Sequence, residues 1–195
     1  MSEGQVRRRT GGRSARVRQD ILDATLQAVA EHGAEAISIP AIARQAGVHE
    51  TSVYRRWGTR EHLVVDALLD YSRQHLAVPD TGTLRGDLIA FADELTAYLA
   101  TPFGTALVRS MSATADETPA LAETREDFWR SRFETARVMI DRAVTRGELP
   151  EDTDAALTLE ILIAPLHFRA LLTRRPIDDH LTGRIVDVLL TGIAH

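Results

Sequence analysis

Two short apolar patterns separated by a glycine constrain the fold of this 195-residue chain more than any other feature. They lie in the stretch ISIPAIARQAGVHETSVYRRWG, residues 37–58. The first pattern has helical spacing and consists of Ile39, Ile42, Ala43 and Ala46. Gly47 interrupts it, and Val53 and Trp57, four residues apart, then mark the inward face of a second short helix over about 49–57. Helices this short are not stable alone in water, so the pair must share a core with neighbouring elements.

Helical patterns flank this pair on both sides. The preceding pattern ends at Gly33 and consists of Ile21, Leu22, Thr25, Leu26 and Val29. The following pattern begins behind a predicted cap at Thr59 and consists of Leu63, Val64, Ala67, Leu68 and Tyr71. Ser38 is placed to cap the first short helix. The sequence therefore predicts a small domain over 18–78 that contains three helices and a longer exit helix, with the central pair, 38–46 and 49–57, forming a helix-turn-helix.

The rest of the chain also has only helical patterns, so the predicted fold class is all-α. After a turn-rich link at 79–82, residues 83–195 are expected to form a larger second helical domain. Proline and glycine boundaries divide it into helices over about 83–100, 103–114, 118–147, 153–174 and 178–194. Residues 1–17, rich in Arg, Gly and Ser without apolar periodicity, are predicted to form a disordered basic arm.

One predicted helix is apolar on nearly every side. It contains LTLEILIAPLHFRALL, residues 157–172, and such a helix must be covered on more than one face. The cover is either the rest of a monomer or a partner subunit. Pro165 lies inside the segment and is expected to kink it or split it in two.

Composition restricts the chemistry and the compartment. The absence of cysteine excludes disulfides, thiolate metal sites and thiol nucleophiles, and it fits a reducing cytoplasm. No uninterrupted apolar run reaches 18 residues, so no membrane span is expected. The basic N-terminus lacks the apolar segment of a signal peptide. We therefore expect a cytoplasmic protein.

Charge is distributed unevenly along the chain, whose net charge is −5. Residues 1–60 carry ten arginines against six acidic residues, and residues 61–195 carry 13 against 22. A basic end on an acidic body suggests that the basic end meets a polyanion. All 23 basic residues are arginine, which fits either phosphate recognition or the codon bias of a GC-rich genome.

A helix-turn-helix places the start of its second helix against base edges in the major groove of DNA. The residues expected there are His49, Glu50, Thr51, Ser52 and, one turn on, Arg55. Those expected near phosphates are Arg44, Tyr54, Arg56 and Arg60. Ser38 and Thr59 would present helix N-termini, which suit anions. The arginines of the arm, which could follow phosphates or enter the minor groove, are Arg7, Arg8, Arg9, Arg13, Arg16 and Arg18. The alternative is a solvated arginine face on a small helical subdomain.

The run ISIPAIARQAGVHETSVYRRWGTREHLV, residues 37–64, resembles the helix-turn-helix of the tetracycline-repressor (TetR) family of bacterial regulators. The matching elements are Ser38-Ile39, Ile42-Ala43, Ala46-Gly47-Val48, Val53-Tyr54, an aromatic residue at 57 and Thr59-Arg60-Glu61. Two positions depart from the family pattern. Lysine is commoner than arginine at the position of Arg60, and Glu50 stands where polar or basic residues are frequent. The base sequence that the helix would read is therefore left open.

The resemblance implies a transcriptional regulator, by default a repressor that binds a palindromic operator as a homodimer and is released by a small molecule. RGELP (146–150) before ILIAPLHFRALL (161–172) also resembles one common C-terminal subgroup. In this family the last two long helices of each subunit form an intersubunit four-helix bundle, which here implies a homodimer through 153–174 and 178–194. The second of these helices would contribute Leu181, Ile185, Val188, Leu189 and Ile193.

The resemblance also implies a small-molecule pocket between the middle helices. Candidate lining residues are Phe91, Tyr98, Phe103, Leu107, Met111, Trp129, Phe133, Arg137 and His167. Plain core packing is the alternative for each apolar member, and Trp129 and Phe133 lie on the main apolar stripe of their helix. Arg137 and His167 are more informative, because a polar group on an apolar element needs a partner.

The sequence gives little support for an enzymatic function. The sequence has no phosphate loop, no Gly-x-Ser-x-Gly and no His-Glu-x-x-His, and no cofactor is expected. His62 and Asp66 are four residues apart and could touch a metal, but a solvated helix face explains them better. A second class of function is a helical small-molecule-binding protein or enzyme with a vestigial DNA-binding head.

Overall fold

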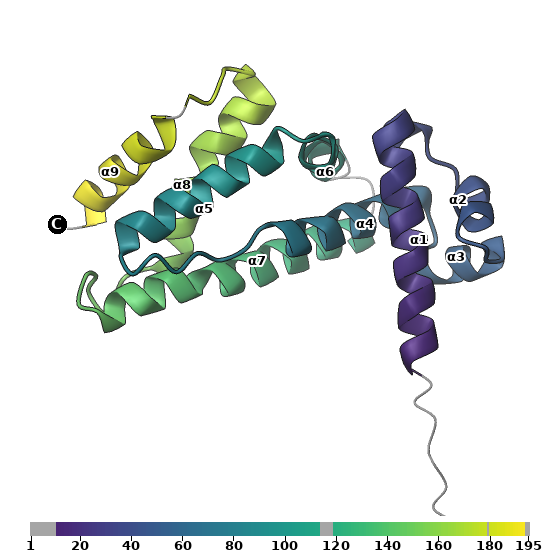
Figure 1. The fold of residues 1–195 in the computed structure, drawn as a ribbon, viewed down its shortest axis with the longest axis horizontal. Coiled ribbons are helices and arrows are strands. Elements are labelled where there is room, and N and C mark those ends of the chain that lie inside the picture. The colour runs from purple at the N-terminus through teal and green to yellow at the C-terminus, as the bar shows by residue number, and fades with distance from the viewer. Residues whose placement is uncertain (1–10, 114–118, 179, 194–195) are drawn as a thin grey trace, which may run out of the picture. The chain divides into compact units, whose positions relative to one another are not determined.

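The computed structural model describes residues 11–113, 119–178 and 180–193, and within these ranges it contains helices and no strand (Figure 1). The all-α prediction is therefore confirmed. The chain divides into two compact units, the first ending at Ala67 and the second beginning at Leu68. Both boundary residues lie within α4 (Arg60–His75), so this helix contributes to both units.

The first unit contains α1 (Gly11–His32), the single turn η1 (Ala34–Ala36), α2 (Ile39–Gln45), α3 (Glu50–Trp57) and the first half of α4. Helix α2 contacts both α1 and α3. The core of the unit consists mainly of Ile21, Leu22, Val29, Ile42, Ala43, Val53, Trp57 and Leu63. Thr25 is also buried, and its hydroxyl donates to the carbonyl of Ile21 at 2.8 Å. The predicted stripes thus form one small core.

Helix α1 begins at Gly11, seven residues before the predicted start at Arg18, so residues 11–17 of the predicted arm are helical. The physical reason is that alanine and arginine favour helix without any apolar periodicity, and α1 extends through such residues beyond its buried stripe. Residues 1–10, including Arg7, Arg8 and Arg9, lie outside the described residues.

The turn between α2 and α3 is fixed by Gly47. Its φ of 66° lies in the left-handed region, which glycine adopts without a side-chain penalty. The N–H of Gly47 donates to the carbonyl of Arg44 at 3.3 Å, and the N–H of Val48 donates to that of Ala43 at 2.9 Å. These two bonds form a Schellman motif, which ends α2 and sets the direction in which α3 leaves.

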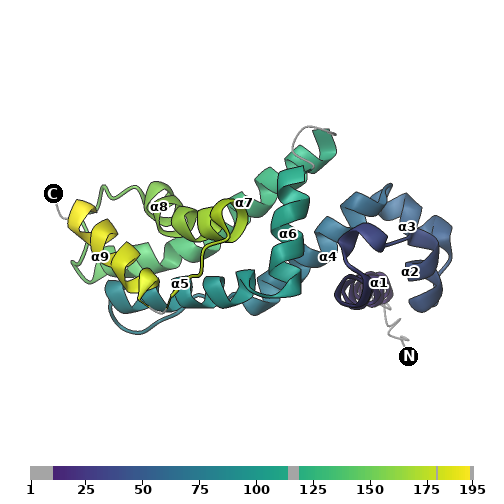
Figure 2. The ribbon, with the colours of Figure 1, turned by 90° about the horizontal axis from the view of Figure 1, so that it is seen from above.

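The second unit contains the end of α4, then α5 (Leu84–Leu99), α6 (Pro102–Ala113), α7 (Pro119–Thr145), α8 (Ala155–Phe168), the π-helical turn η2 (Arg169–Thr173) and α9 (Leu181–Ile193). Helix α5 is central, because it contacts α6, α7, α8 and α9. Helix α6 crosses α5 instead of running along it (Figure 2). The observed bounds agree with the predicted spans to within about three residues.

Pro165 does not split the predicted helix, because α8 continues through it to Phe168. The regular hydrogen-bonding pattern changes four residues later, where η2 adopts wider π-helical turns. A proline removes one backbone donor and crowds the preceding turn, and a π segment is one way to accommodate the disturbance.

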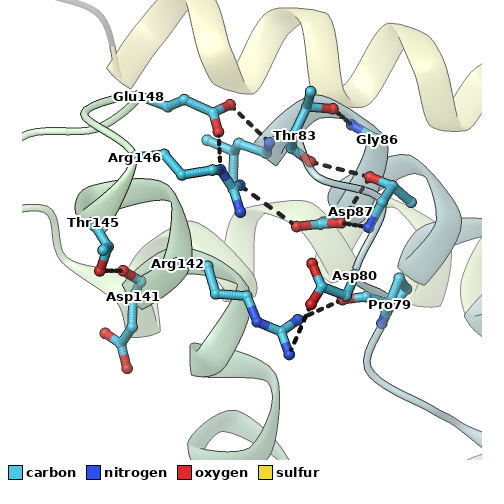
Figure 3. A network of polar contacts seen from close by, with 12 residues as sticks. Pro79, Asp80, Thr83, Gly86, Asp87, Asp141, Arg142, Thr145, Arg146 and Glu148 are labelled. Carbon is cyan, nitrogen blue, oxygen red and sulfur yellow. Dashed lines mark hydrogen bonds and ion pairs between the residues drawn. The ribbon is translucent and has the colours of Figure 1, made fainter.

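A polar network joins the start of α5 to the end of α7 (Figure 3). Asp87 is fully buried, and one of its oxygens accepts from the backbone N–H of Thr81 at 2.6 Å and from its hydroxyl at 2.8 Å. The Arg146 guanidinium lies 3.7 Å from the other oxygen and also pairs with Glu148. Glu148 in turn accepts from the N–H of Leu84 at 2.8 Å, so this network fixes the first turn of α5.

Candidate nucleic-acid interface and apolar cavity

Helix α3 has one buried and one exposed face. Val53 and Trp57 are buried and hold the helix to the core, as predicted. The exposed residues at its start and along its outer face are His49, Glu50, Thr51, Tyr54, Arg55 and Arg56. Ser52 is half-buried. Apart from Ser52, the residues predicted to meet base edges are therefore exposed to solvent.

The arginines of the predicted interface differ in what they bind within the protein. Arg44 and Arg55 are exposed and form no hydrogen bond or ion pair with any described residue. Arg56 donates to the hydroxyl of Ser14 at 2.9 Å and lies over the Trp57 ring, 5.6 Å from its centroid. Arg44 and Arg55 are thus the arginines of α2 and α3 most available to an anion.

Arg60 is occupied by two partners within its own unit. It pairs with Glu61 at 2.7 Å and donates to the backbone carbonyl of Glu35. A phosphate near Arg60 would have to share or displace these partners, which makes Arg60 a weaker candidate than Arg44.

Ser38 and Thr59 have the capping roles that the sequence predicted. The Ser38 hydroxyl accepts from the N–H of Ala41, and the Thr59 hydroxyl accepts from the N–H of His62, both at 3.3 Å. Both residues are exposed, so the helix starts that they cap face solvent.

Arg18 does not belong to the phosphate-binding set in which the sequence placed it. One of its terminal nitrogens donates to both oxygens of Asp66, at 2.9 and 3.0 Å. Asp66 also accepts from the indole N–H of Trp57 at 2.9 Å. This carboxylate therefore links α1, α3 and α4. Pattern reasoning missed the link because its members are 48 and nine residues apart.

His62 and Asp66 do not form a metal site. The Nδ1 of His62 is hydrogen-bonded to the carbonyl of Trp57 at 2.9 Å, while Asp66 is occupied as described above. Throughout the described ranges, no three His, Asp or Glu side chains gather where they could hold a metal ion.

The second unit encloses a cavity of about 210 Å³. One water molecule needs only about 10–15 Å³ on the same measure, so a small organic molecule could occupy this space. Six of the nine predicted ligand residues line it: Phe91, Tyr98, Leu107, Trp129, Phe133 and His167. Most of the remaining wall is aliphatic, which gives the cavity its apolar character.

Two predicted ligand residues, Phe103 and Arg137, do not line this cavity. Phe103 contacts the ring of Tyr71, with centroids 4.4 Å apart. Arg137 is exposed and pairs with Asp141 at 3.2 Å, so it has the partner that a polar group needs without a ligand. The side chain of Met111 lies outside the described part of the chain.

The buried arginine of α7 is Arg132, which the sequence analysis missed. It lines the cavity with 9% of its surface exposed. The sequence signal for its burial is a second stripe, displaced by one residue from the predicted stripe of Trp129 and Phe133. This second stripe consists of Phe128, Arg132, Ala136, Met139 and Ala143. An arginine inside an apolar stripe is easily attributed to the polar face, which is why it was overlooked.

His167 is a neutral member of the cavity wall. Its Nδ1 is hydrogen-bonded to the carbonyl of Ile163 at 3.0 Å, and its ring packs edge-on against Trp129 at 5.6 Å. Burial lowers the pKa of His167 below its usual value. A carbonyl can only accept, so the proton of the neutral ring lies on Nδ1, and Nε2 is left as an acceptor.

Helices α8 and α9 expose apolar side chains. In α8 and η2 these residues are spaced as one helical stripe, consisting of Leu157, Ile161, Ala164, Phe168 and Leu172. Leu172 is 72% exposed, and Val188 of α9 is 75% exposed. The opposite side of α8, including Leu159 and Leu162, is buried within the unit. The predicted second dimer helix, α9, also has one buried and one exposed side. Leu181 and Leu189 are buried within the unit, whereas Val188 is exposed.

One helix among the described residues, Ala155–Thr173, is long and apolar enough to cross a membrane by length and composition alone. Core helices of soluble proteins pass the same test, so the indication is weak. The exposed apolar stripe of this helix is also suited to packing against another helix.

Comparison with known proteins gives a consistent identity. Residues 21–67 match the family model of bacterial regulatory proteins of the tetR family, and residues 78–189 match the tetracyclin repressor-like C-terminal domain. The chain is 37% identical over 180 residues to the HTH-type transcriptional regulator AqdR of Rhodococcus erythropolis, covering 92% of this chain and 86% of AqdR. It is 32% identical over 174 residues to a DNA-binding transcriptional repressor TetR of Mycobacteroides abscessus, covering 87% and 90%.

Among solved structures, a crystal structure of a TetR family transcription regulator superposes with a TM-score of 0.81 at 27% identity, covering 91% of this chain and 98% of the other. The family models together span both units, and the relatives align along most of the chain. The chain therefore belongs to the tetR family of bacterial regulatory proteins, and it is a helix-turn-helix transcriptional regulator, not an enzyme.

Proposed function

We propose that this regulator is a repressor that binds a palindromic operator as a homodimer and leaves it when a small molecule fills the cavity. The observation that carries the proposal is the outer face of α3, where Arg55 stands exposed and unpaired among the described residues. Such a helix, held at its back by Val53 and Trp57, has the form that enters a major groove. This function places the protein in the cytoplasm, with the bacterial DNA.

Arg55 and Arg44 have different roles in this proposal. Arg55, one turn into α3, meets base edges and contributes to sequence selection. Arg44, on α2, meets a phosphate and contributes affinity for any sequence. The exposed side chains of His49 and Thr51, together with the half-buried Ser52, complete the contact with the bases, and Glu50 accepts from a cytosine amino group.

A dimer is supported by the apolar stripe of α8 and η2 together with Val188 of α9. Two heads at a fixed spacing are what a palindromic site requires, because the symmetry of the protein then matches that of the DNA. Regulators of this family bind DNA and small molecules, typically as dimers.

Release depends on the position of the cavity along the chain. Ser72 of α4 and Leu76, the residue directly after this helix, line the cavity, and the first half of α4 belongs to the DNA-binding unit. A ligand that contacts α4 favours one position of this helix. That position sets the spacing between the two DNA-binding units of the dimer. The ligand lowers operator affinity only as far as it binds that state more tightly than the DNA-bound state.

The test is selection from a random duplex DNA pool at physiological salt, followed by measurement of how affinity for the selected site depends on salt. A palindrome bound with a steep salt slope is the expected result. Weak binding without sequence preference would instead favour the second candidate, a small-molecule-binding protein with a vestigial head.

Two substitutions separate the roles within the interface. Arg55→Ala should cost about 1–3 kcal/mol on the selected site and relax its sequence preference. Arg44→Ala should weaken binding to all sequences and reduce the salt slope by about one. Arg130→Ala is the matched control, because Arg130 is an exposed arginine of α7 that pairs with Glu126 and Asp127. Equal effects of the Arg55 and Arg130 substitutions would refute the assignment.

A further inference from the structure

The cavity combines an apolar wall with a cation that has no anionic partner among the described residues. Arg132 is 91% buried, from its exposed fraction of 9%, and its one hydrogen bond to the described residues goes to the carbonyl of Leu76 at 3.3 Å. The lining includes two arginines, Arg132 and Arg125, and no aspartate or glutamate. A buried charge without a counter-ion is costly, so a guanidinium in this position calls for an anion that the described protein does not supply.

Two hydroxyl groups in the same wall, those of Tyr98 and Ser72, are near enough to influence each other but do not form a hydrogen bond of good geometry. Tyr98 and Ser72 are 6% and 1% exposed, and neither hydroxyl reaches hydrogen-bond geometry with any described group. Buried polar groups are almost always hydrogen-bonded, so these two neighbouring hydroxyls have hydrogen-bonding capacity left for a further polar group. Both line the cavity, which is where that group would have to be.

The three polar groups act on one another, so they form one cluster. Burial raises the pKa of Tyr98 to about 12, while the nearby hydroxyl of Ser72 and, to a smaller extent, the charge of Arg132 oppose this rise. Burial likewise lowers the pKa of Arg132, and the charge of Arg73 adds to that effect. Near neutral pH the tyrosine keeps its proton and the arginine keeps its charge. The cluster therefore offers hydrogen-bond donors around a positive centre.

We propose that the effector of this regulator is an apolar molecule with one acidic oxygen group, a carboxylate or an equally acidic oxyanion. This inference rests on the proposed function, in which the effector occupies the cavity. Its oxyanion binds the Arg132 guanidinium and accepts from the hydroxyls of Tyr98 and Ser72. Its apolar body packs against Phe91, Trp129 and Phe133.

The same arrangement disfavours other classes of ligand. A neutral analogue leaves Arg132 without a counter-ion, and a cation is repelled by it. A dianion brings a second charge into a cavity in which only one guanidinium is deeply buried, because Arg125 is half-exposed. The cavity thus selects an anionic ligand in two ways. It binds the oxyanion, and any neutral ligand leaves the Arg132 charge without a counter-ion.

The test uses the full-length protein and matched probes on two apolar frames. The first set is decanoate, decanol and decylamine, and the second is naphthaleneacetate and the corresponding naphthyl ethanol. Calorimetry measures their dissociation constants, and displacement of the selected operator measures their effect on DNA binding. At least one carboxylate should bind about tenfold or more tightly than its neutral analogue, in line with a charged hydrogen bond.

The variants show whether Arg132 is responsible. Arg132→Met keeps most of the side-chain volume and should abolish the preference for the carboxylate, and Tyr98→Phe should reduce it. Arg130→Met, which removes an exposed arginine from the same helix, should leave the preference unchanged. Without any ligand, Arg132→Met should melt at a higher temperature than the parent, because it removes a charge that has no counter-ion.

Three results would overturn the inference. The first is that no carboxylate binds, or that neutral analogues bind as tightly. The second is that the preference survives in Arg132→Met. The third is that Arg132→Met melts at a lower temperature than the parent, which would make Arg132 a structural residue bound to Leu76. If neutral probes release the operator and carboxylates do not, the proposed function stands and the ligand class fails. If carboxylates bind selectively without releasing DNA, the class stands and the proposed function fails.

Discussion

At the scale of single residues, Gly104 is fixed by a close approach of two backbones. A Cβ added there would lie 2.8 Å from the carbonyl carbon of Tyr98 and 2.9 Å from the Cα of Leu99. Alanine would gain about 1 kcal/mol of helix propensity, but backbone atoms cannot move aside as a flexible side chain can. We expect Gly104→Ala to lower the free energy of unfolding by a net ~1–3 kcal/mol, measured by urea denaturation.

Gly12 of α1 is the matched control, because a Cβ there would meet nothing within 4 Å. Gly12→Ala should be neutral or slightly stabilising. If both substitutions were neutral, α6 would have room to move away from α5, and the crossing would not be fixed by this contact.

Single residues also show where sequence patterns fail. Tyr98, Trp129 and His167, which the sequence placed in one predicted pocket, line one cavity because they lie on helices with clear boundaries. Arg137 was chosen as the polar ligand residue, whereas Arg132 is the buried one. The two arginines are five residues apart, which places them about 140° apart around the helix axis. One therefore lies on the buried side of α7 and the other on the exposed side. Fixing the face needs the packing of α7 against its neighbours, which no local pattern contains.

At the scale of elements, proline and glycine boundaries predicted nearly every helix of the second unit. The helix-turn-helix was predicted as well, because Gly47 and the paired apolar stripes are local signals. What local signals could not give were the long-range contacts. The link from Arg18 to Asp66 spans 48 residues, and the bond from Leu84 to Glu148 spans 64. Such pairs are set by how helices pack, so one sequence without its fold does not reveal them.

Glu148 makes the junction of α5 and α7 sensitive to acid. Its pKa is lowered mainly by the hydrogen bond from the N–H of Leu84, with a further contribution from Arg146. Because the folded-state pKa is below the unfolded value of about 4.3, the stabilisation is present above that pH and is lost as the pH falls through the folded pKa. We expect Glu148→Gln to be less stable than the parent by about 1 kcal/mol or less at pH 7, since the group is partly exposed.

The difference between parent and Glu148→Gln should shrink as the pH falls below about 4, measured by urea denaturation across a pH series. Glu151→Gln, at an exposed glutamate three residues later, serves as the control and should match the parent throughout. A difference that stays constant with pH would mean that the carboxylate charge of Glu148 does not stabilise the junction.

At the scale of the whole molecule, the proposed dimer contact through the apolar stripe of α8 and η2 would link oligomeric state to DNA binding. Ile161 is 47% exposed at the centre of this stripe, next to the small side chain of Ala164. A charge placed there would lie inside a subunit interface without a partner, at a cost of several kcal/mol for two symmetry-related sites. We expect Ile161→Glu to give a folded monomer at micromolar concentration in analytical ultracentrifugation, with weaker binding to the palindrome but not to a single half-site.

Val138 provides the comparison that decides between an interface and a general effect of charge. It is an exposed apolar residue of α7, 40% exposed, and it lies outside the stripe. Val138→Glu adds the same charge to a comparable surface, so it should leave both the dimer and its DNA affinity intact. If the two variants behave alike, the stripe of α8 is not the contact between subunits. If only Ile161→Glu dissociates, the loss of palindrome binding follows from the loss of the second head, because the residues proposed to meet the DNA are unchanged.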